Sequence, residues 1–288
     1  MHLKYWLMLY FLALILIGFL IGSIGTLIGA GGGFLLVPLL LIFFPALDPE
    51  VVTAISIAVV AANAVSGTFA YARGKRIDYR AGLMFALFTI PGSILGVYIT
   101  NYIPKHWFQV IFGALLLVLS VYLFVKNRKK NVAQNALPQH AAGGNWKHSS
   151  ITDKSGHTYS YTYNQLHGII ISVLVGFISP LLGIGGGIIH VPAMVQWLQF
   201  PVYVATATSH FILAIMSSVS VGVHIVNGHY NDPEVLRMVI GFIIGVLPGA
   251  QLGAYLSHRI STTAIIRALA VCLALVGVRI LFSAIAAL

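Results

Sequence analysis

A glycine cluster followed by a proline occurs twice in this chain, each time inside an apolar run. The first copy reads GAGGGFLLVP over residues 29–38, and the second reads GIGGGIIHVP over residues 183–192. Consecutive glycines weaken a helix and leave backbone N–H and C=O groups without helical partners. Lipid offers such groups no hydrogen bonds, so this backbone has to be buried in protein or to line a watery cavity. Paired glycine- and proline-interrupted segments in two halves of a chain are typical of transporter binding sites.

The composition is that of a polytopic membrane protein. Of the 288 residues, 59% are hydrophobic and only 8% are charged, whereas a soluble domain has about 25% charged residues. Most of the Lys and Arg residues lie between apolar runs, at 73–80 and 126–154, which is the pattern of cytoplasmic loops. We therefore expect a multi-pass protein of the cytoplasmic membrane, with the lipid bilayer and not nucleic acid as its surroundings.

The apolar runs predict an all-α bundle of transmembrane helices. Eight runs approach or exceed the ~20 residues that a bilayer crossing needs: 5–28, 51–72, 80–100, 107–125, 166–183, 203–226, 235–257 and 264–286. Two shorter runs, 34–44 and 188–199, directly follow the glycine clusters and are expected to be half-helices or re-entrant segments. Cys272 is the single cysteine and lies in an apolar run, so we expect a buried thiol and no intramolecular disulfide.

The match between the two halves extends beyond the glycines. Thr53-Ala-Ile-Ser corresponds to Thr206-Ala-Thr-Ser, and Pro91-Gly corresponds to Pro248-Gly. This duplication divides the chain into a first transmembrane repeat (1–125), a linker (126–165) and a second repeat (166–288). If the two short segments are re-entrant, each half crosses the membrane four times, the repeats are parallel and both termini are cytoplasmic. If the short segments cross the membrane, each half has five crossings, the repeats are inverted and both termini lie outside. The basic residues do not decide between these, and both place the linker in the cytoplasm; nothing indicates the oligomeric state.

The linker carries a hairpin signal. Residues 150–161 alternate β-forming side chains around the turn-like Asp153-Lys-Ser-Gly156, which predicts a small β-hairpin. Either a plain connector or a partner-binding loop accounts for a segment of this length.

The glycine clusters are also chemically suggestive. Converging backbone N–H groups form an anion-binding nest, and a helix that begins just afterwards adds its positive dipole end. Close helix packing or a tight re-entrant turn is the alternative interpretation. No Walker lysine and no strand-glycine-helix context are present, so we do not expect nucleotide binding. A second glycine series, at 241, 245, 249 and 253, recurs every four residues and predicts close helix packing.

Polar side chains within the expected spans are the remaining candidates. Asn63, His190, His210 and Gln251 lie in apolar runs, where polar residues often mark a substrate path. Hydrogen bonding between helices is the alternative for each of them, and a histidine can also relay protons. No acidic residue lies clearly inside a span, which favours a substrate that is itself negative. No metal-ligand spacing and no Gly-x-Ser-x-Gly motif occurs, so we expect no enzyme activity, cofactor, metal or catalytic residue.

The duplicated chain resembles the TauE/SafE family of sulfite exporter-like permeases. The resemblance is carried by the two glycine clusters, each with its downstream proline, in a protein of about eight spans, and it covers all but the linker. It implies transport of small sulfur-containing anions, such as sulfite or organosulfonates, across the cytoplasmic membrane. The length of the linker departs from the family's minimal pattern.

We therefore expect a transporter in which both glycine clusters meet at an oxyanion site near the middle of the bilayer. Its expected substrate-binding residues are Gly29, Gly31, Gly32, Gly33, Gly183, Gly185, Gly186, Gly187, Asn63, Ser209, His210 and Gln251. Four prolines are expected to serve conformational change: Pro38, Pro91, Pro192 and Pro248. Protons are the suggested coupling ion. The alternatives are an anion channel and a membrane-embedded sensor or scaffold that acts through the linker.

Overall fold

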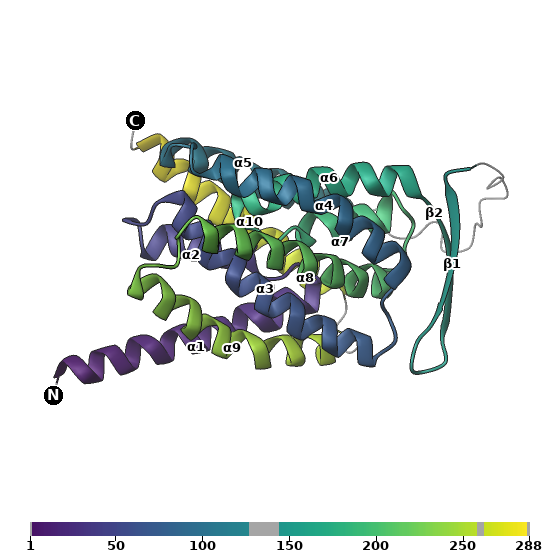
Figure 1. Ribbon diagram of the computed structural model, residues 1–288, viewed down its shortest axis with the longest axis horizontal. Helices are drawn as coiled ribbons and strands as arrows, with labels where there is room; N and C mark the ends of the chain where they lie inside the picture. Colours follow the sequence, from purple (N-terminus) through teal and green to yellow (C-terminus); the bar gives the residue numbers. More distant parts are fainter. Residues whose placement is uncertain (1, 127–143, 258–261, 287–288) are drawn as a thin grey trace.

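The protein is an elongated bundle of helices with a small β-hairpin at one end (Figure 1). The computed structural model describes residues 2–126, 144–257 and 262–286. The first half contains α1 (His2–Ile28), α2 (Gly33–Phe43), α3 (Pro49–Arg73), α4 (Tyr79–Thr100) and α5 (Lys105–Lys126). The second contains α6 (Gln165–Leu182), α7 (Gly187–Gln196), α8 (Val202–Val226), α9 (Pro233–Leu256) and α10 (Thr262–Ala286). Seven described helices are long and apolar enough to cross a membrane, and α10, with 25 residues, corresponds to the eighth expected span.

The two short helices turn back toward the end from which their half begins. After the glycine cluster, α2 returns along the molecule, so that Phe44 lies against Tyr10 near the start of α1, with ring centroids 6.4 Å apart. In the second half, α7 returns likewise, and Phe200 beyond it packs against Tyr163, which directly precedes α6, with centroids 5.1 Å apart. Each half therefore opens with a helical hairpin whose tip is the glycine cluster.

The two halves run in opposite directions. The first begins at the left end in Figure 1, and α6 begins at the opposite end, beside the β-hairpin. Because each opening hairpin returns to its own end, the three following helices carry the chain across. The short segments are therefore re-entrant. The expectation that re-entrant segments go with parallel repeats is wrong, because the two halves are inverted. As a result, α1 begins and α10 ends at the same end of the molecule (Figure 1).

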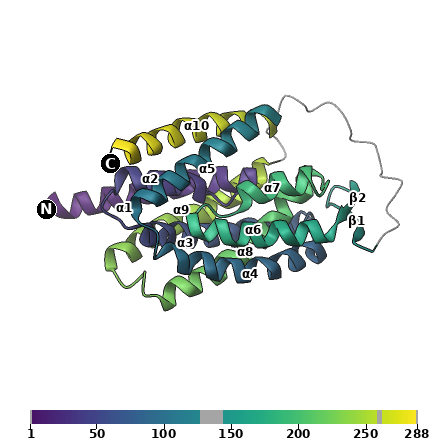
Figure 2. The same cartoon turned by 90° about the horizontal axis from the view of Figure 1, so that it is seen from above.

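Helices of opposite halves pair with each other. The N-terminal helix of each half packs along the fourth helix of the other, giving the pairs α1–α9 and α6–α4, while α3 packs on α8 at the centre. The pair α5–α10 lies along one side (Figure 2). A Cβ on Gly245, Gly249 or Gly253 of α9 would overlap backbone atoms of α1. This contact confirms that the four-residue glycine series serves helix packing.

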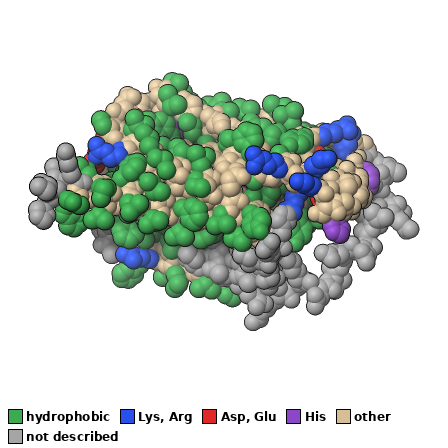
Figure 3. Space-filling model, turned by 90° about the horizontal axis from the view of Figure 1, so that it is seen from below, with side chains coloured by type: hydrophobic (Ala, Val, Ile, Leu, Met, Phe, Trp, Pro, Cys, Tyr) green, Lys and Arg blue, Asp and Glu red, His purple; other side chains and the backbone are tan. Residues whose placement is uncertain are grey.

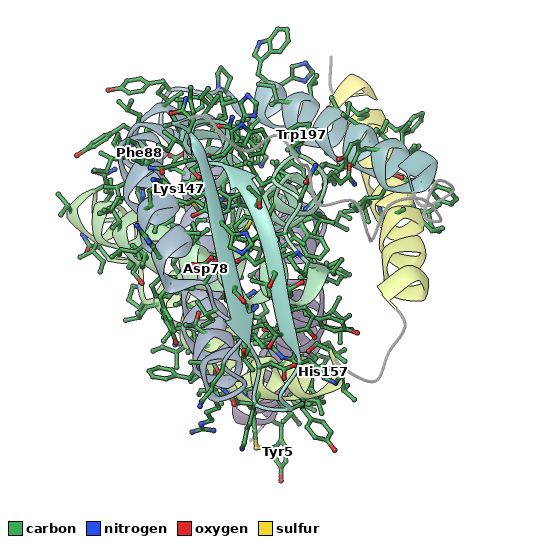
Figure 4. All side chains as sticks on the ribbon, turned by 90° about the vertical axis from the view of Figure 1, so that its right-hand side faces the viewer. Tyr5, Asp78, Phe88, Lys147, His157 and Trp197 are labelled. Carbon is green, nitrogen blue, oxygen red and sulfur yellow. The ribbon has the colours of Figure 1, made fainter. Side chains whose placement is uncertain are left out.

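The linker forms the hairpin that the sequence predicts. Strand β1 (Trp146–Thr152) pairs antiparallel with β2 (Thr158–Asn164). The turn is held by the carboxylate of Asp153, which accepts hydrogen bonds from the backbone N–H groups of Ser155 at 2.8 Å and His157 at 3.0 Å. Figure 4 looks onto this end of the molecule and shows both strands lying across the helix ends, with Asp78 beside β1.

The outer surface is suited to lipid. Figure 3 shows a mostly hydrophobic face, on which Lys and Arg side chains lie mainly toward the two ends. Large apolar side chains are exposed along the outer helices, including Leu9, Leu16, Leu83, Leu87, Val118, Val121, Ile240 and Ile244. An apolar belt of this kind around helices long enough to span a bilayer identifies a multi-pass membrane protein.

Candidate functional site

The two glycine clusters touch each other at the centre of the bundle. A Cβ on Gly33 would overlap the carbonyl oxygen of Gly183, and a Cβ on Gly187 would overlap that of Gly29. A Cβ on Gly31 would lie 3.6 Å from the carbonyl oxygen of Gly185. The two hairpin tips therefore pack backbone against backbone, as the sequence predicts, and glycine is required because no side chain fits between them.

Both clusters have the same backbone conformation. Positive φ angles occur at three glycines in each, Gly29, Gly31 and Gly32 in one copy and Gly183, Gly185 and Gly186 in the other. Such angles are costly for any residue with a Cβ. The conformation explains why the glycines recur in register although the two tips enter from opposite ends.

The cluster conformation also leaves backbone donors unused. Gly32, which precedes α2, provides no side-chain cap. Among the described residues, no acceptor is found for the N–H groups of Gly32, Gly33 or Phe34. In the other cluster the same holds for the N–H groups of Gly185 and Gly186. Buried N–H groups at a helix N-terminus are suited to bind an anion.

A cluster of polar side chains lies beside this contact. The hydroxyl of Thr26, one turn before Gly29, donates a 2.8 Å hydrogen bond to Oδ1 of Asn63 and lies 3.3 Å from Nε2 of His210. The hydroxyl of Tyr71 donates at 2.7 Å to the carbonyl of Thr26, and its ring packs edge-on against the His210 ring. These contacts join α1 and α3 of the first half to α8 of the second.

Several atoms of this region have no partner. Nδ2 of Asn63, Oγ of Ser209 and Nδ1 of His210 are buried and have no hydrogen-bond partner among the described residues. Buried polar groups in proteins are nearly always paired. An amide NH2 is a donor only, and a hydroxyl is free to donate. The unused donors beside the glycine contact are therefore available to bind an anion.

The electrostatics of the centre agree with a negative ligand. The buried charged residues that the structure describes, Arg76, Asp78 and Asp153, all lie at the hairpin end. No carboxylate among the described residues therefore lies at the centre to repel an anion. No group of three or more His, Cys, Asp or Glu residues able to hold a metal ion occurs in the described ranges.

Two of the polar residues singled out from the sequence lie elsewhere. The amide of Gln251 donates to the carbonyl of Ser66 at 2.7 Å and to its hydroxyl at 2.9 Å, which joins α9 to α3. His190 is buried with its Nε2 3.4 Å from Oγ of Ser172, between α6 and α7. The structure thus gives Gln251 the bond between helices that was its alternative role, and it does not bring Gln251 into the central cluster.

The four prolines differ in their surroundings. Pro38 is buried within α2, and Pro192 is partly buried within α7. Pro91 and Pro248 lie inside α4 and α9 with their rings exposed on the outer faces, and both helices continue through them. A role in conformational change stays a prediction for all four.

Three members of this region are not among the residues predicted from the sequence. Thr26 and Tyr71 are buried in spans and connect the polar cluster, and Ser179, whose buried hydroxyl has no partner among the described residues, lies against Gly186. Thr26 precedes the first glycine cluster by three residues, and Ser179 precedes the second by four. That proximity was the available signal, whereas Tyr71 is far from either cluster along the chain.

Comparisons with known proteins agree with this architecture. A family model described as sulfite exporter TauE/SafE matches residues 14–280. The probable membrane transporter protein YunE of Bacillus subtilis is 32% identical over 285 residues, which cover 96% of this chain and 98% of YunE. A probable membrane transporter protein of Methanocaldococcus jannaschii is 27% identical over 86% of both chains, and one of Xylella fastidiosa is 26% identical over 86% of this chain and 84% of its own. No solved structure matches the chain. Because the family model matches nearly the whole chain, and the chain has the two glycine clusters inside a multi-pass bundle, this protein belongs to the sulfite exporter TauE/SafE family.

Proposed function

We propose that this protein is a secondary permease that moves small sulfur-containing oxyanions, such as sulfite or organosulfonates, across the cytoplasmic membrane. The observation that carries the proposal is the set of unused donors beside the contact of the two glycine clusters. The family description and the names of the relatives support transport and not catalysis.

The proposed site binds the anion mainly through neutral donors. The amide of Asn63 and the hydroxyl of Ser209 would each donate to an oxygen of the substrate, and Nδ1 of His210 would do so when the ring is protonated. The free N–H groups of Gly32 and Gly33 add the positive end of α2. Hydrogen bonds to an ionised acceptor are about twice as strong as neutral ones, so such a site holds an oxyanion without a permanent positive charge.

The inverted halves supply a route for alternating access. A site between inverted repeats opens to one side or the other when one half moves against its partner. In this structure the hairpin covers the end where α6 begins, because Tyr161 and Tyr163 are buried against Phe200. Protons are the proposed coupling ion, since the central site contains a histidine and no carboxylate among the described residues.

The charges indicate which end faces the cytoplasm. At the hairpin end lie Arg73, Lys75, Arg76, Arg80, Lys147 and Lys154. The opposite end carries Lys105 and Arg237 together with the acidic residues Asp48, Glu50, Asp232 and Glu234. Because cytoplasmic loops have an excess of Lys and Arg, we assign the hairpin to the cytoplasmic side and the start of α1 to the outer side.

The test is anion binding and flux in proteoliposomes, with Ser209→Ala as the main variant. Removing an unpaired hydroxyl leaves the fold intact, whereas losing a bond to an anion should weaken sulfite or sulfonate binding by about 10-fold or more. Ser218→Ala is the matched control, because Ser218 is exposed on the same helix and donates to the carbonyl of Ala214. Unchanged affinity of both Ser209→Ala and Asn63→Ala for every sulfur oxyanion tested would refute the site. Uphill accumulation in a pH gradient distinguishes a permease from an anion channel.

A further inference from the structure

A second cluster of buried polar groups lies at the outer end of α8. Nδ1 of His224, in the last turn of α8, is 2.7 Å from Nδ1 of His229, in the loop between α8 and α9. At this distance one of the two nitrogens carries a hydrogen and the other accepts it. The two rings, with centroids 5.0 Å apart, therefore share one hydrogen and form a single titratable unit.

One ring of the pair is buried and the other is partly exposed, and the pair is incompletely bonded. His224 is buried, and neither its Nε2 nor Nδ2 of Asn227 has a partner among the described residues. The hydroxyl of Tyr230, in the same loop, donates at 2.9 Å to the carbonyl of Ala54 and so fixes the loop against α3. Tyr230 is also the titratable neighbour whose ring centroid lies 6.3 Å from that of His224.

One charged group acts on the pair from the helix packed beside it. Glu50, in the first turn of α3, is the charged residue of the described chain whose field reaches His229. Burial lowers the pKa of His229 below its ordinary value of 6.5, and Glu50 opposes that shift. Burial therefore favours the neutral ring of His229, which binds a proton only when its surroundings become more acidic.

Buried polar side chains lie along α8 between this pair and the central site. His210, Ser217 and His224 recur at seven-residue intervals and so share one face of α8, and all three are buried. The fourteen residues from His210 to His224 span about 21 Å at 1.5 Å per residue. The hydroxyls of Ser217 and Ser220 donate to carbonyls of their own helix. The lone pairs of both hydroxyl oxygens can therefore still accept hydrogen bonds.

This line of polar side chains is specific to the second half. Positions 217, 220 and 224 correspond, by the offset that relates Thr53 to Thr206, to positions 64, 67 and 71 of α3. Those positions are Ala64, Gly67 and Tyr71. A line of polar groups required for packing alone would recur in both halves, because α3 and α8 occupy equivalent places in the fold.

We propose that the His224–His229 pair is the site where one proton from the outer side binds in each transport cycle, and that the polar face of α8 links it to the anion site. In this step the lone pair of a ring nitrogen accepts a proton from hydronium, whose O–H bond breaks, and a neutral water molecule is released. A second proton is excluded, because two imidazolium charges at this separation repel each other. This inference rests on the proposed function.

The first experiment measures coupling in proteoliposomes with a labelled alkanesulfonate, whose charge does not change between pH 5 and 8. We expect His224→Gln and His229→Gln to lose accumulation driven by an acidic outer side by about 10-fold while retaining exchange of labelled for unlabelled anion. His106→Gln, at the same end of the molecule, is the control and should behave like the wild type. Full accumulation in both pair variants would overturn the proposal.

The second experiment does not depend on the substrate. Nitrogen NMR of histidine-labelled protein in detergent should show the two rings titrating together with uptake of one proton. His224→Gln should return His229 to the titration of an isolated histidine, and His106→Gln should leave the pair unchanged. Identical titration of His229 with and without His224 would contradict the proposal that the two rings titrate as one unit. If no sulfur anion is transported at all, the proposed function fails while this measurement still decides the proton site.

Discussion

The hydroxyl of Ser56 donates a 2.6 Å hydrogen bond to the carbonyl of Gly183, so α3 of the first half holds the glycine cluster of the second. Ser209 occupies the corresponding place in α8, yet its buried hydroxyl has no partner among the described residues. Equivalent serines thus have different roles in the two halves. One stabilises a hairpin tip, and the other has a hydroxyl that the proposed anion site would use.

Ser56→Ala and Ser209→Ala should therefore differ in stability. Without the Ser56 hydroxyl, the buried carbonyl of Gly183 loses its side-chain donor, which should cost about 1–3 kcal/mol. Removing the unpaired hydroxyl of Ser209 should leave the stability unchanged or slightly higher. Thermal unfolding of the purified variants in detergent without anion measures both effects, and equal losses would contradict the assigned roles.

The contact of the two hairpin tips predicts a strong effect of single methyl groups. Gly33→Ala and Gly187→Ala each place a Cβ into the backbone of the opposite tip, and overpacking of this kind costs about 1–3 kcal/mol or more. Gly222→Ala is the control, because nothing lies within 4 Å of its Cβ, and it should stabilise α8 by about 0.5–1 kcal/mol. Detergent unfolding midpoints below the wild type for the first two and above it for the third are expected.

Much of the fold was predictable because it depends on local signals. The glycine runs predicted the breaks before α2 and α7, and the apolar lengths predicted the long helices to within a few residues. The β-hairpin followed from alternation around Asp153. The meeting of the two clusters followed from the duplication, since equivalent tips of two halves tend to meet on a symmetry axis.

The direction of the halves and the membership of the site were not predictable in the same way. Direction depends on whether α2 returns to its starting end, which a contact such as that between Tyr10 and Phe44 decides. The hydrogen bond of Gln251 to Ser66 spans 185 residues, and no local pattern encodes it. Polar residues in spans therefore indicated candidates, while only the long-range contacts show which of them bond neighbouring helices and which have unpaired atoms.

Docking of the β-hairpin should fail at alkaline pH. The hydroxyls of Ser149 and Tyr161 both donate at 2.7 Å to Oδ2 of Asp78. Burial, followed by the charge of Asp78, raises the pKa of Tyr163 to about 12 from 10.0. Because the folded state favours the neutral phenol, the stabilisation is complete below pH 10 and is lost as the pH rises toward 12.

Proteolysis after Lys147 and Lys154 as a function of pH measures this undocking. Cleavage should increase between pH 10 and 12 in the wild type. The double variant Tyr161→Phe/Tyr163→Phe retains the aromatic packing but lacks both of these phenols. Cleavage should be somewhat higher at pH 8, because the bond to Asp78 is lost, and it should change less with pH, because neither position can ionise. A wild-type profile that is flat up to pH 12 would show that ionisation of these tyrosines does not control docking.

Cysteine labelling tests the inverted arrangement and its orientation together. In a Cys272→Ser background, which removes the single native thiol, Asn231→Cys places a thiol in the exposed α8–α9 loop and Trp197→Cys places one at the hairpin end (Figure 4). With the basic hairpin end in the cytoplasm, an impermeant maleimide should label position 231 in intact cells and position 197 only after permeabilisation. Parallel repeats with the linker inside require the reverse result, because residue 231 would then follow an inward crossing and residue 197 would face outward.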